Sequence, residues 1–173
     1  MEEIRIERLT EDHFHLHSLD NFIRHQIVKE CWRKVDGQWV LLPIAFVEEW
    51  SLEKCREEAA EIIRHQHGKM VDYGAFQGEN LLGYITIGTE KIGTENQYVQ
   101  LAAFQVSEPF RVRGVGRKLF EKAIETAKEY GAKSFIFPPI RQRNLRLPIR
   151  HWDVYTPRKS SRGLQRKNPM TCH

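Results

Sequence analysis

The N-terminal part of the chain alternates between strand-like and helix-like spacings of apolar residues. Residues 4–9 (IRIERL) place apolar side chains at alternate positions, which predicts a short strand. In residues 11–30 the apolar positions are spaced less regularly, and we expect a helix with an irregular start. Those positions are Phe14, Leu16, Leu19, Phe22, Ile23 and Ile27.

A hairpin and a further helix are predicted next. Asp36-Gly37 separates the stretches WRKV and QWVLL, and this dipeptide is a strong signal for a two-residue hairpin turn. Ser51 is a typical helix N-cap, and apolar residues then recur at helical spacing. They are Leu52, Cys55, Ala59, Ile62 and Ile63.

From Met70 onward the pattern is that of strands. Residues 71–75 and 81–87 flank a turn at residues 77–80 and predict an antiparallel pair. Residues 98–106 predict the next strand, and a period of two that skips one position within it indicates a β-bulge. The predicted inward positions are Val99, Leu101 and Ala103, followed by Phe104 and Val106.

An amphipathic helix and a last strand complete the pattern. Gly131 is expected to end the helix as a left-handed cap, and residues 132–137 start the strand. The apolar side of the helix holds Leu119, Phe120, Ala123, Ile124, Ala127 and Tyr130. The order strand, helices, three antiparallel strands, helix and strand predicts a mixed α/β (α+β) domain.

The segment with the most specific chemistry is the loop at residues 111–116, which leaves a predicted strand and opens directly into a helix. Free amides and the helix dipole favour a phosphate group there, and Gly114 and Gly116 let the backbone approach it. Basic residues surround the same spot, namely Arg111, Arg113, Arg117 and Lys118. A glycine turn with solvated basic residues is the alternative interpretation of these features alone.

The sequence of this loop, R-V-R-G-V-G, resembles the R/Q-x-x-G-x-G/A signature of the GNAT superfamily of N-acetyltransferases, which also follows a strand and precedes a helix. The resemblance covers roughly residues 3–133 and is sharpest over 98–133. The loop lacks the Gly-Lys-Ser/Thr ending of a P-loop, and it lacks the third glycine and the later acidic residue of a Rossmann loop.

The resemblance implies a twisted sheet flanked by helices, in which strands 98–106 and 132–137 splay around a slot for acetyl-CoA. The amides of residues 112–117 would hold the pyrophosphate, the backbone of residues 104–106 would pair with the pantetheine arm, and Arg117 or Lys118 would reach the 3′-phosphate. The implied binding residues are Phe104, Gln105, Val106, Arg111, Val112, Arg113, Gly114, Val115, Gly116, Arg117 and Lys118.

The resemblance also implies direct transfer of an acetyl group to a primary amine of a small molecule or a protein, with the N–H of Val106 polarising the thioester carbonyl. Some family members carry a glutamate base on the fourth strand, but Gln100 stands at that spacing here and cannot act as a base. Glu90 and Glu108 are nearby acidic candidates, and each is otherwise a solvated surface residue. A water wire to solvent would remove the need for a base.

Charge divides the chain into two parts. Of the 27 Lys/Arg and 23 Asp/Glu, residues 141–173 contain nine bases and only the acid Asp153, so residues 1–140 hold 18 bases and 22 acids. We expect a GNAT-like domain at residues 1–137 and a basic tail at 138–173. A basic tail is also a candidate for nucleic-acid binding.

The tail departs from the family pattern, which continues with a helix containing a tyrosine and an ending like Tyr-x-x-Leu-Gly. When the permitted codons are read one base earlier from Lys133 onward, they allow such an ending, and the Trp152 and Asp153 codons fix its glycine. This favours a segment translated out of frame from about Ser134, which would lack the tyrosine that serves as thiolate acid and would impair activity. The alternative is a genuine basic extension.

The remaining features limit cofactors and compartment. The cysteines Cys31, Cys55 and Cys172 form no CxxC pair, the start MEEIRIERL lacks the features of a secretory signal, and the apolar runs are too short to cross a membrane. We therefore expect a cytoplasmic protein. The closely spaced histidines lack a third ligand, so no metal site is expected.

The sequence leaves three functions open. The first is an acetyl-CoA-dependent N-acetyltransferase, the second a non-catalytic acyl-CoA-binding module, and the third a nucleic-acid-binding protein acting through its tail. The aromatic residues of the 31–50 region either pack a core or shape the acceptor site. The amine acceptor stays unidentified and the oligomeric state open, a homodimer being one alternative.

Overall fold

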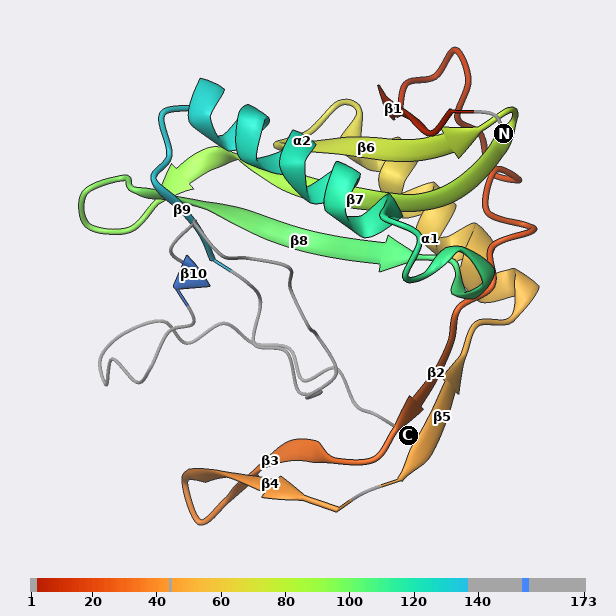
Figure 1. Cartoon of the computed structure of the whole chain (residues 1–173). Helices are drawn as coiled ribbons and strands as arrows, with labels where there is room; N and C mark the ends of the chain where they lie inside the picture. The colour runs from red at the N-terminus through yellow and green to blue at the C-terminus, as the bar shows by residue number, and fades with distance from the viewer. Residues whose placement is uncertain (1–2, 44, 137–153, 156–173) are drawn as a thin grey trace.

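The computed structural model of the chain describes residues 3–43, 45–136 and 154–155, and its main feature is a six-stranded sheet in the order β1-β6-β7-β8-β9-β10 (Figure 1). The first three pairs in this order are antiparallel and the last two are parallel. The prediction of a mixed α/β domain with a mostly antiparallel sheet is confirmed. The strands are β1 (Arg5–Arg8), β6 (Met70–Gln77), β7 (Asn80–Ile92), β8 (Tyr98–Val106), β9 (Ser134–Ile136) and β10 (Val154–Tyr155).

Two helices cover opposite faces of this sheet, with α2 (Val115–Glu129) in front and α1 (Leu52–His65) behind in the view of Figure 1. Ser51 caps α1 by accepting a hydrogen bond from the Lys54 amide at 3.2 Å, as predicted. Gly131, with φ of 71°, follows α2 and lets the Ala132 amide reach back to the Ala127 carbonyl, which confirms the predicted left-handed cap. Neither of the described helices is long and apolar enough to cross a membrane.

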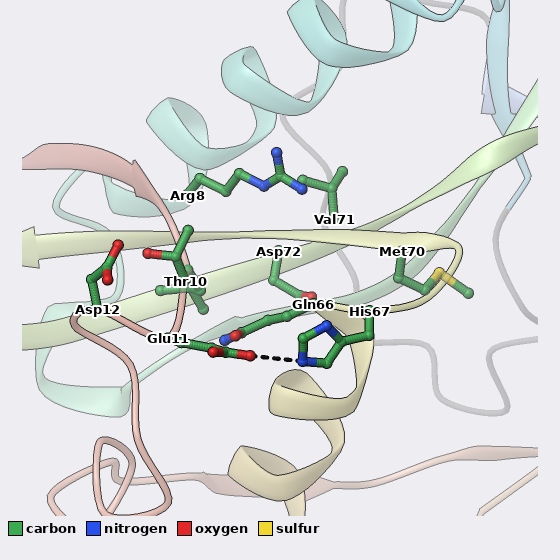
Figure 2. Close-up of a pocket in the computed structure, with 10 residues that line it drawn as sticks. Arg8, Thr10, Glu11, Asp12, Gln66, His67, Met70, Val71 and Asp72 are labelled. Carbon is green, nitrogen blue, oxygen red and sulfur yellow. Dashed lines mark ion pairs between the residues drawn. The ribbon is translucent and has the colours of Figure 1, made fainter.

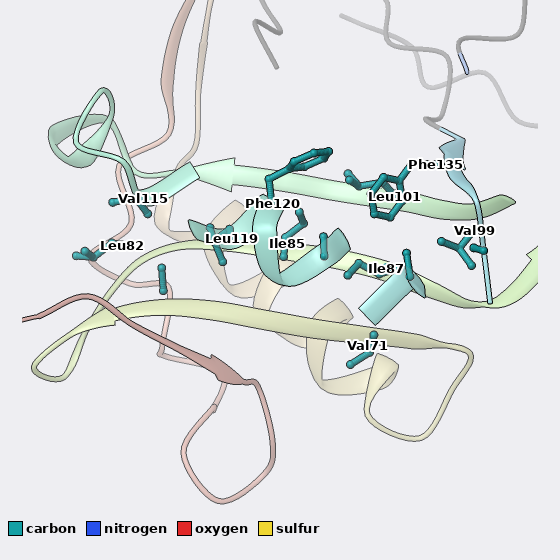
Figure 3. Close-up of a cluster of buried hydrophobic side chains, with 14 residues drawn as sticks. Val71, Leu82, Ile85, Ile87, Val99, Leu101, Val115, Leu119, Phe120 and Phe135 are labelled. Atoms are coloured by element: carbon teal, nitrogen blue, oxygen red, sulfur yellow. The ribbon is translucent and has the colours of Figure 1, made fainter. Parts of the chain in front are cut away.

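The face under α2 holds the larger apolar core (Figure 3). The predicted helix residues Leu119, Phe120, Ala123 and Ala127 are all buried in it, against side chains of β6 to β9. The strand residues of this core are Val71, Ala75, Leu82, Ile85, Ile87, Val99, Leu101 and Phe135. The amphipathic pattern of α2 therefore predicted the face that it buries.

A second core lies on the α1 face, and neighbouring residues of β7 show how the sheet separates the two. Tyr84 packs into the α1-side core, whereas Ile85 packs under α2, as the alternation of side chains along a strand requires. The α1-side core contains Leu9, Phe14, Leu19, Phe22, Cys55, Ala59, Ile62 and Phe76 together with Tyr84.

The helix predicted over residues 11–30 is wrong. The segment consists of consecutive turns and ends in β2 (His25–Val28). Side chains compete with helical bonds here, since the Ser18 hydroxyl accepts from the His15 amide at 2.9 Å. Phe14, Leu19 and Phe22 are buried, but their spacing of five and three residues does not follow one side of a helix.

Residues 25–49 form an arm that extends away from the main sheet (Figure 1). β2 pairs antiparallel with β5 (Phe46–Glu49), and beyond them β3 (Cys31–Val35) pairs with β4 (Gln38–Leu42). Asp36 and Gly37 connect β3 to β4 with φ of 46° and 79°, the left-handed values that a two-residue hairpin turn requires. The predicted hairpin is confirmed.

β8 contains the predicted bulge, but its position differs. Thr86 pairs with Ala103 and Ile87 pairs with Leu101, so Ala102 is the extra residue. Leu101 is buried under α2 and Phe104 packs against the same core, whereas Ala103 packs on the α1 side. The prediction that Ala103 shares the inward phase of Leu101 is therefore wrong, because the skipped position precedes Ala103.

Pairing between β8 and β9 is recorded for Tyr98, Val99 and Gln100. Residues 137–153 and 156–173 lie outside the described part of the chain. The splaying of the two strands beside residues 104–106, the domain boundary at 137 and the reading frame of the segment from about Ser134 therefore stay predictions.

A buried carboxylate ties α1 to the sheet. Asp72 is 2% exposed and accepts hydrogen bonds from the Thr86 hydroxyl at 2.5 Å and from His65 Nδ1 at 3.2 Å. The bond to Asp72 raises the pKa of His65 above its usual value, although burial acts in the opposite direction. His65 is therefore more readily protonated in the folded state than in the unfolded chain.

Replacement of His65 by glutamine is expected to destabilise the protein more at acidic than at alkaline pH. Because the folded-state pKa is raised, the stabilisation from His65 is fully present below its ordinary pKa of about 6.5 and is lost as the pH rises through the raised value. The measurement is the melting temperature of the parent and His65→Gln at about pH 6 and about pH 9. His15→Gln, at an exposed position, is the control, and an equal loss at both pH values would contradict the assignment.

Candidate functional site

The loop that joins β8 to α2 has an unusual backbone. A short 3-10 helix (Glu108–Phe110) leads to Val112, whose φ of 61° is uncommon for a β-branched residue and whose side chain is completely exposed. Gly114 occupies the N-cap position of α2 with φ of 84°, and Val115 then turns inward and is buried. Strain of this kind concentrates at functional sites.

The backbone amides from Val112 to Arg117 donate to no backbone acceptor in the described part of the chain. The first recorded bond of the helix start is from the Lys118 amide to the Gly114 carbonyl at 3.1 Å, and no side chain caps the helix. A Cβ atom added at Gly114 would meet nothing within 4 Å. The position that a side chain at Gly114 would take is therefore empty, and free amides at a helix start favour an anion.

The edge of β8 that faces away from β7 supplies further backbone groups. The Ser107 amide bonds to the Leu82 carbonyl across the strand pair, so the odd-numbered residues Gln105 and Ala103 also bond toward β7. Phe104 and Val106 consequently direct their N–H and C=O groups to the opposite edge. Between residues 101 and 106 no strand pairing on that edge is recorded among the described residues.

Arg111 fixes the position of the loop. Its Nε donates to the Val106 carbonyl at 3.1 Å, and its NH1 group donates to the His25 carbonyl at 2.7 Å. The guanidinium thus connects the end of β8 to the start of the arm. This cation was predicted to contribute to phosphate binding, and the structure shows that much of its donor capacity is used on backbone oxygens.

The side chains of the other three predicted cations make contacts in different directions. Arg113 lies over the Phe110 ring at 5.8 Å, and Arg117 donates to Glu121 on the next helical turn at 2.9 Å. Lys118 reaches the Ile4 carbonyl at 3.3 Å, which leads it toward the N-terminal strand. Gly116 brings α2 close to β8, since an added Cβ would lie 3.3 Å from the Phe104 ring.

The acidic candidates lie near opposite ends of β8, Glu90 on the neighbouring strand β7 and Glu108 in the short 3-10 helix. Glu90 is 60% exposed and forms an ion pair with Lys69. The next residue, Lys91, is the strand partner of Val99, which lies roughly 20 Å along β8 from Val106. Glu108 lies beside the loop and accepts from His25 Nδ1 at 3.2 Å. The structure therefore brings Glu108, and not Glu90, close to the other predicted site residues.

Two further ionisable pairs near the end of β8 were missed by sequence reasoning. Arg24 is 8% exposed and donates to Glu48 at 2.9 Å, and burial lowers the pKa of its guanidinium. The buried Tyr84 donates its hydroxyl hydrogen to Glu58 at 3.4 Å, and burial and that carboxylate raise the pKa of Tyr84 well above its usual value. These partners are distant in the sequence, so no local motif indicates them.

A hollow of about 320 Å³ lies elsewhere, between the end of β1, the end of α1 and the start of β6 (Figure 2). Figure 2 shows Glu11 and His67 facing each other across it, in an ion pair of 2.7 Å. Its other lining residues are Arg8, Leu9, Thr10, Asp12, Gln66, Met70, Val71 and Asp72. None of the predicted site residues contributes to this wall.

Comparison with protein families finds the same family that the motif of the loop resembles. The model of the acetyltransferase (GNAT) family matches residues 27–147, more than half of the chain. The chain belongs to the GNAT acetyltransferase family. The resemblance inferred from residues 111–116 is thereby confirmed at the level of the family.

Solved structures support the same fold. The chain is similar to a nourseothricin acetyltransferase, with a TM-score of 0.53, 15% identity and coverage of 75% of this chain and 69% of the other. For a proposed streptothricin acetyltransferase from Bacillus anthracis in complex with acetyl coenzyme A, the TM-score is 0.50, with 20% identity and coverage of 77% and 72%. For a ribosomal-protein-alanine N-acetyltransferase from Brucella melitensis the TM-score is 0.51 and the identity 12%, with coverage of 91% of this chain and 100% of the other. No curated protein sequence matches the chain.

Gly114→Ala is expected to weaken coenzyme A binding at least tenfold, because a methyl group would enter the open space before the amides. Gly37→Ala is a matched control, since Gly37 also has positive φ, at 79°, and open surroundings, but lies in the arm hairpin. Both variants should lose a similar amount of stability, roughly 1 kcal/mol. Calorimetric titration with coenzyme A measures the difference, and equal affinities would contradict the assignment.

Arg111→Ala is expected to lower both stability and coenzyme A affinity, because two carbonyl oxygens lose a charged donor. Bonds of this kind contribute about 1.5–3 kcal/mol. Arg117→Ala is the comparison, since the exposed Arg117–Glu121 pair contributes less than about 1 kcal/mol. Thermal unfolding of both variants provides the measurement, and a loss for Arg111→Ala no greater than for Arg117→Ala would argue against a structural role.

Proposed function

We propose that this chain transfers the acetyl group of acetyl-CoA directly to a primary amine of a small molecule or a protein. The observation that carries the proposal is the run of amides from Val112 to Arg117, which have no backbone acceptor among residues 3–43, 45–136 and 154–155. In the same residues, the outer edge of β8 has no strand partner beyond Gln100. Family membership supports the acetyl-transfer chemistry, and one solved structure of similar fold is in complex with acetyl coenzyme A.

The residues present fit this cosubstrate. The amides of residues 112–117, with the positive end of the α2 dipole, are suited to the pyrophosphate. The outward N–H and C=O groups of Phe104 and the N–H of Val106 are suited to the amide groups of the pantetheine arm, because an extended chain with alternating donors and acceptors can pair along such an edge. Acetyl-CoA supplies an activated thioester carbonyl as the acetyl donor.

Proton transfer in this proposal involves solvent or the pair of Glu108 and His25. The carboxylate accepts from His25 Nδ1, which leaves the other ring nitrogen available as a base. Gln100 has no basic group, and Glu90, a residue of β7, lies beside the far end of β8. Glu108 is thus the sequence-predicted acid that stays a candidate.

The test is release of the coenzyme A thiol from acetyl-CoA, followed with a thiol-reactive dye across a panel of primary amines. We expect amine-dependent release that is lost in Gly114→Ala and kept in Gly37→Ala. Saturable coenzyme A binding without release for any amine would instead support a non-catalytic acyl-CoA-binding module. Absence of coenzyme A binding would contradict the proposal.

A further inference from the structure

Two carboxylates on the α1 face contact side chains of the sheet, and they differ in accessibility. Asp72 is 2% exposed and is occupied by Thr86 and His65. Glu58, on the sheet-facing flank of α1, has a side chain that is 28% exposed, and one of its oxygens accepts the Tyr84 hydroxyl at 3.4 Å. Glu58 therefore keeps the capacity to bind a group that arrives from solvent.

The second oxygen of Glu58 already binds a primary ammonium group within the chain. Lys54 Nζ lies 3.0 Å from Glu58 Oε1 and 3.2 Å from Glu57 Oε2. The Lys54 side chain is 41% exposed, and ion pairs on a helix surface are weak because water screens them. A competing ammonium ion can therefore displace it at little cost.

Glu58 lies on the α1 face of the sheet, against Tyr84 of β7, the strand that pairs with β8. Tyr84 pairs directly with Gln105, and Ala103 projects to the same α1 face. Neither Gln105 nor Ala103 is completely buried, and neighbouring strands lie only about 4.8 Å apart. The Tyr84–Glu58 pair thus belongs to the strand next to the edge where the acetyl donor is proposed to lie.

Aromatic rings surround the base of this arrangement. The Phe22 ring lies 5.9 Å from both the Trp50 and the Tyr84 rings, and Trp50 is only partly buried. Packing around Tyr84 holds its hydroxyl in place, and the hydroxyl orients the carboxylate.

We infer that Glu58 is a specificity-determining residue that binds the protonated amine of the incoming acceptor, and that Lys54 occupies this position in the absence of acceptor. The ammonium group then gives its proton to solvent or to the pair of His25 and Glu108, and the neutral nitrogen attacks the thioester carbonyl as the coenzyme A thiolate leaves. This assignment rests on the proposed acetyl-transfer function. It selects aliphatic primary ammonium compounds as the acceptor class, because these carry the same charged group as the lysine that they replace. Neutral aromatic amines lack that group and gain nothing from Glu58.

Phenethylamine, titrated calorimetrically into the coenzyme A complex near neutral pH, tests the assignment. Glu58→Gln is expected to weaken its binding about tenfold, whereas Lys54→Met should strengthen it severalfold by removing the internal competitor. Glu57→Gln is the matched control, because Glu57 also contacts Lys54 but is 61% exposed. Equal affinities of Glu58→Gln and Glu57→Gln for phenethylamine would overturn the assignment. So would the absence of phenethylamine binding to both the parent and Lys54→Met.

Steady-state kinetics separates recognition from a general loss of structure. For Glu58→Gln we expect the KM for phenethylamine to rise about tenfold while the KM for acetyl-CoA stays unchanged, and aniline should show no difference from the parent. Tyr84→Phe should raise the phenethylamine KM by a smaller factor, since only the orienting hydroxyl is lost. Absence of coenzyme A binding or thiol release in the parent refutes the transfer function itself. Intact transfer with unchanged amine KM in Glu58→Gln refutes only the role of Glu58.

Discussion

The guanidinium of Arg111 joins two carbonyl oxygens that lie in separate parts of the fold, and the proposed site depends on this connection. One oxygen, that of Val106, ends β8, and the other, that of His25, begins the arm 86 residues before Arg111. Arg111 is thus held at both oxygens, and the next residue, Val112, has a left-handed conformation. The amides from Val112 to Arg117 follow, and no backbone group in the described part of the chain accepts from them.

The bulge at Ala102 sets the phase of β8 relative to both cores. After it, Phe104 and Val106 pack toward α2, while Ala103 faces α1. The α2 side is apolar and supports the helix whose N-terminus forms the loop. The α1 side carries polar groups from Asp72, Tyr84 and Glu58. The two faces of β8 therefore differ in chemistry, and the edge proposed to hold the acetyl donor lies between them.

Sequence patterns predicted the elements that depend on local chemistry. The α2 face, the Asp36-Gly37 turn and the Gly131 cap all follow from spacing or from residues that tolerate positive φ. The irregular apolar spacing of residues 11–30 misled the prediction, because turns stabilised by side chains bury Phe14, Leu19 and Phe22 without a helix.

The candidate site was only partly predictable. The loop at residues 111–116 was evident from its motif, but the motif does not show that Arg111 binds carbonyl oxygens. The His25–Glu108 and Tyr84–Glu58 pairs join residues 83 and 26 positions apart, and only the folded chain brings them together. Charge alone likewise gave Glu90 and Glu108 equal weight until the register of β8 separated them.

A crystal structure of the chain with coenzyme A tests the central claim most directly. We expect the pyrophosphate oxygens within hydrogen-bonding distance of the amides of residues 112–117, and the pantetheine arm paired with the outward backbone groups of Phe104 and Val106. Coenzyme A bound elsewhere, such as in the hollow beside Gln66, would contradict the account, as would a pantetheine arm that makes no contact with β8.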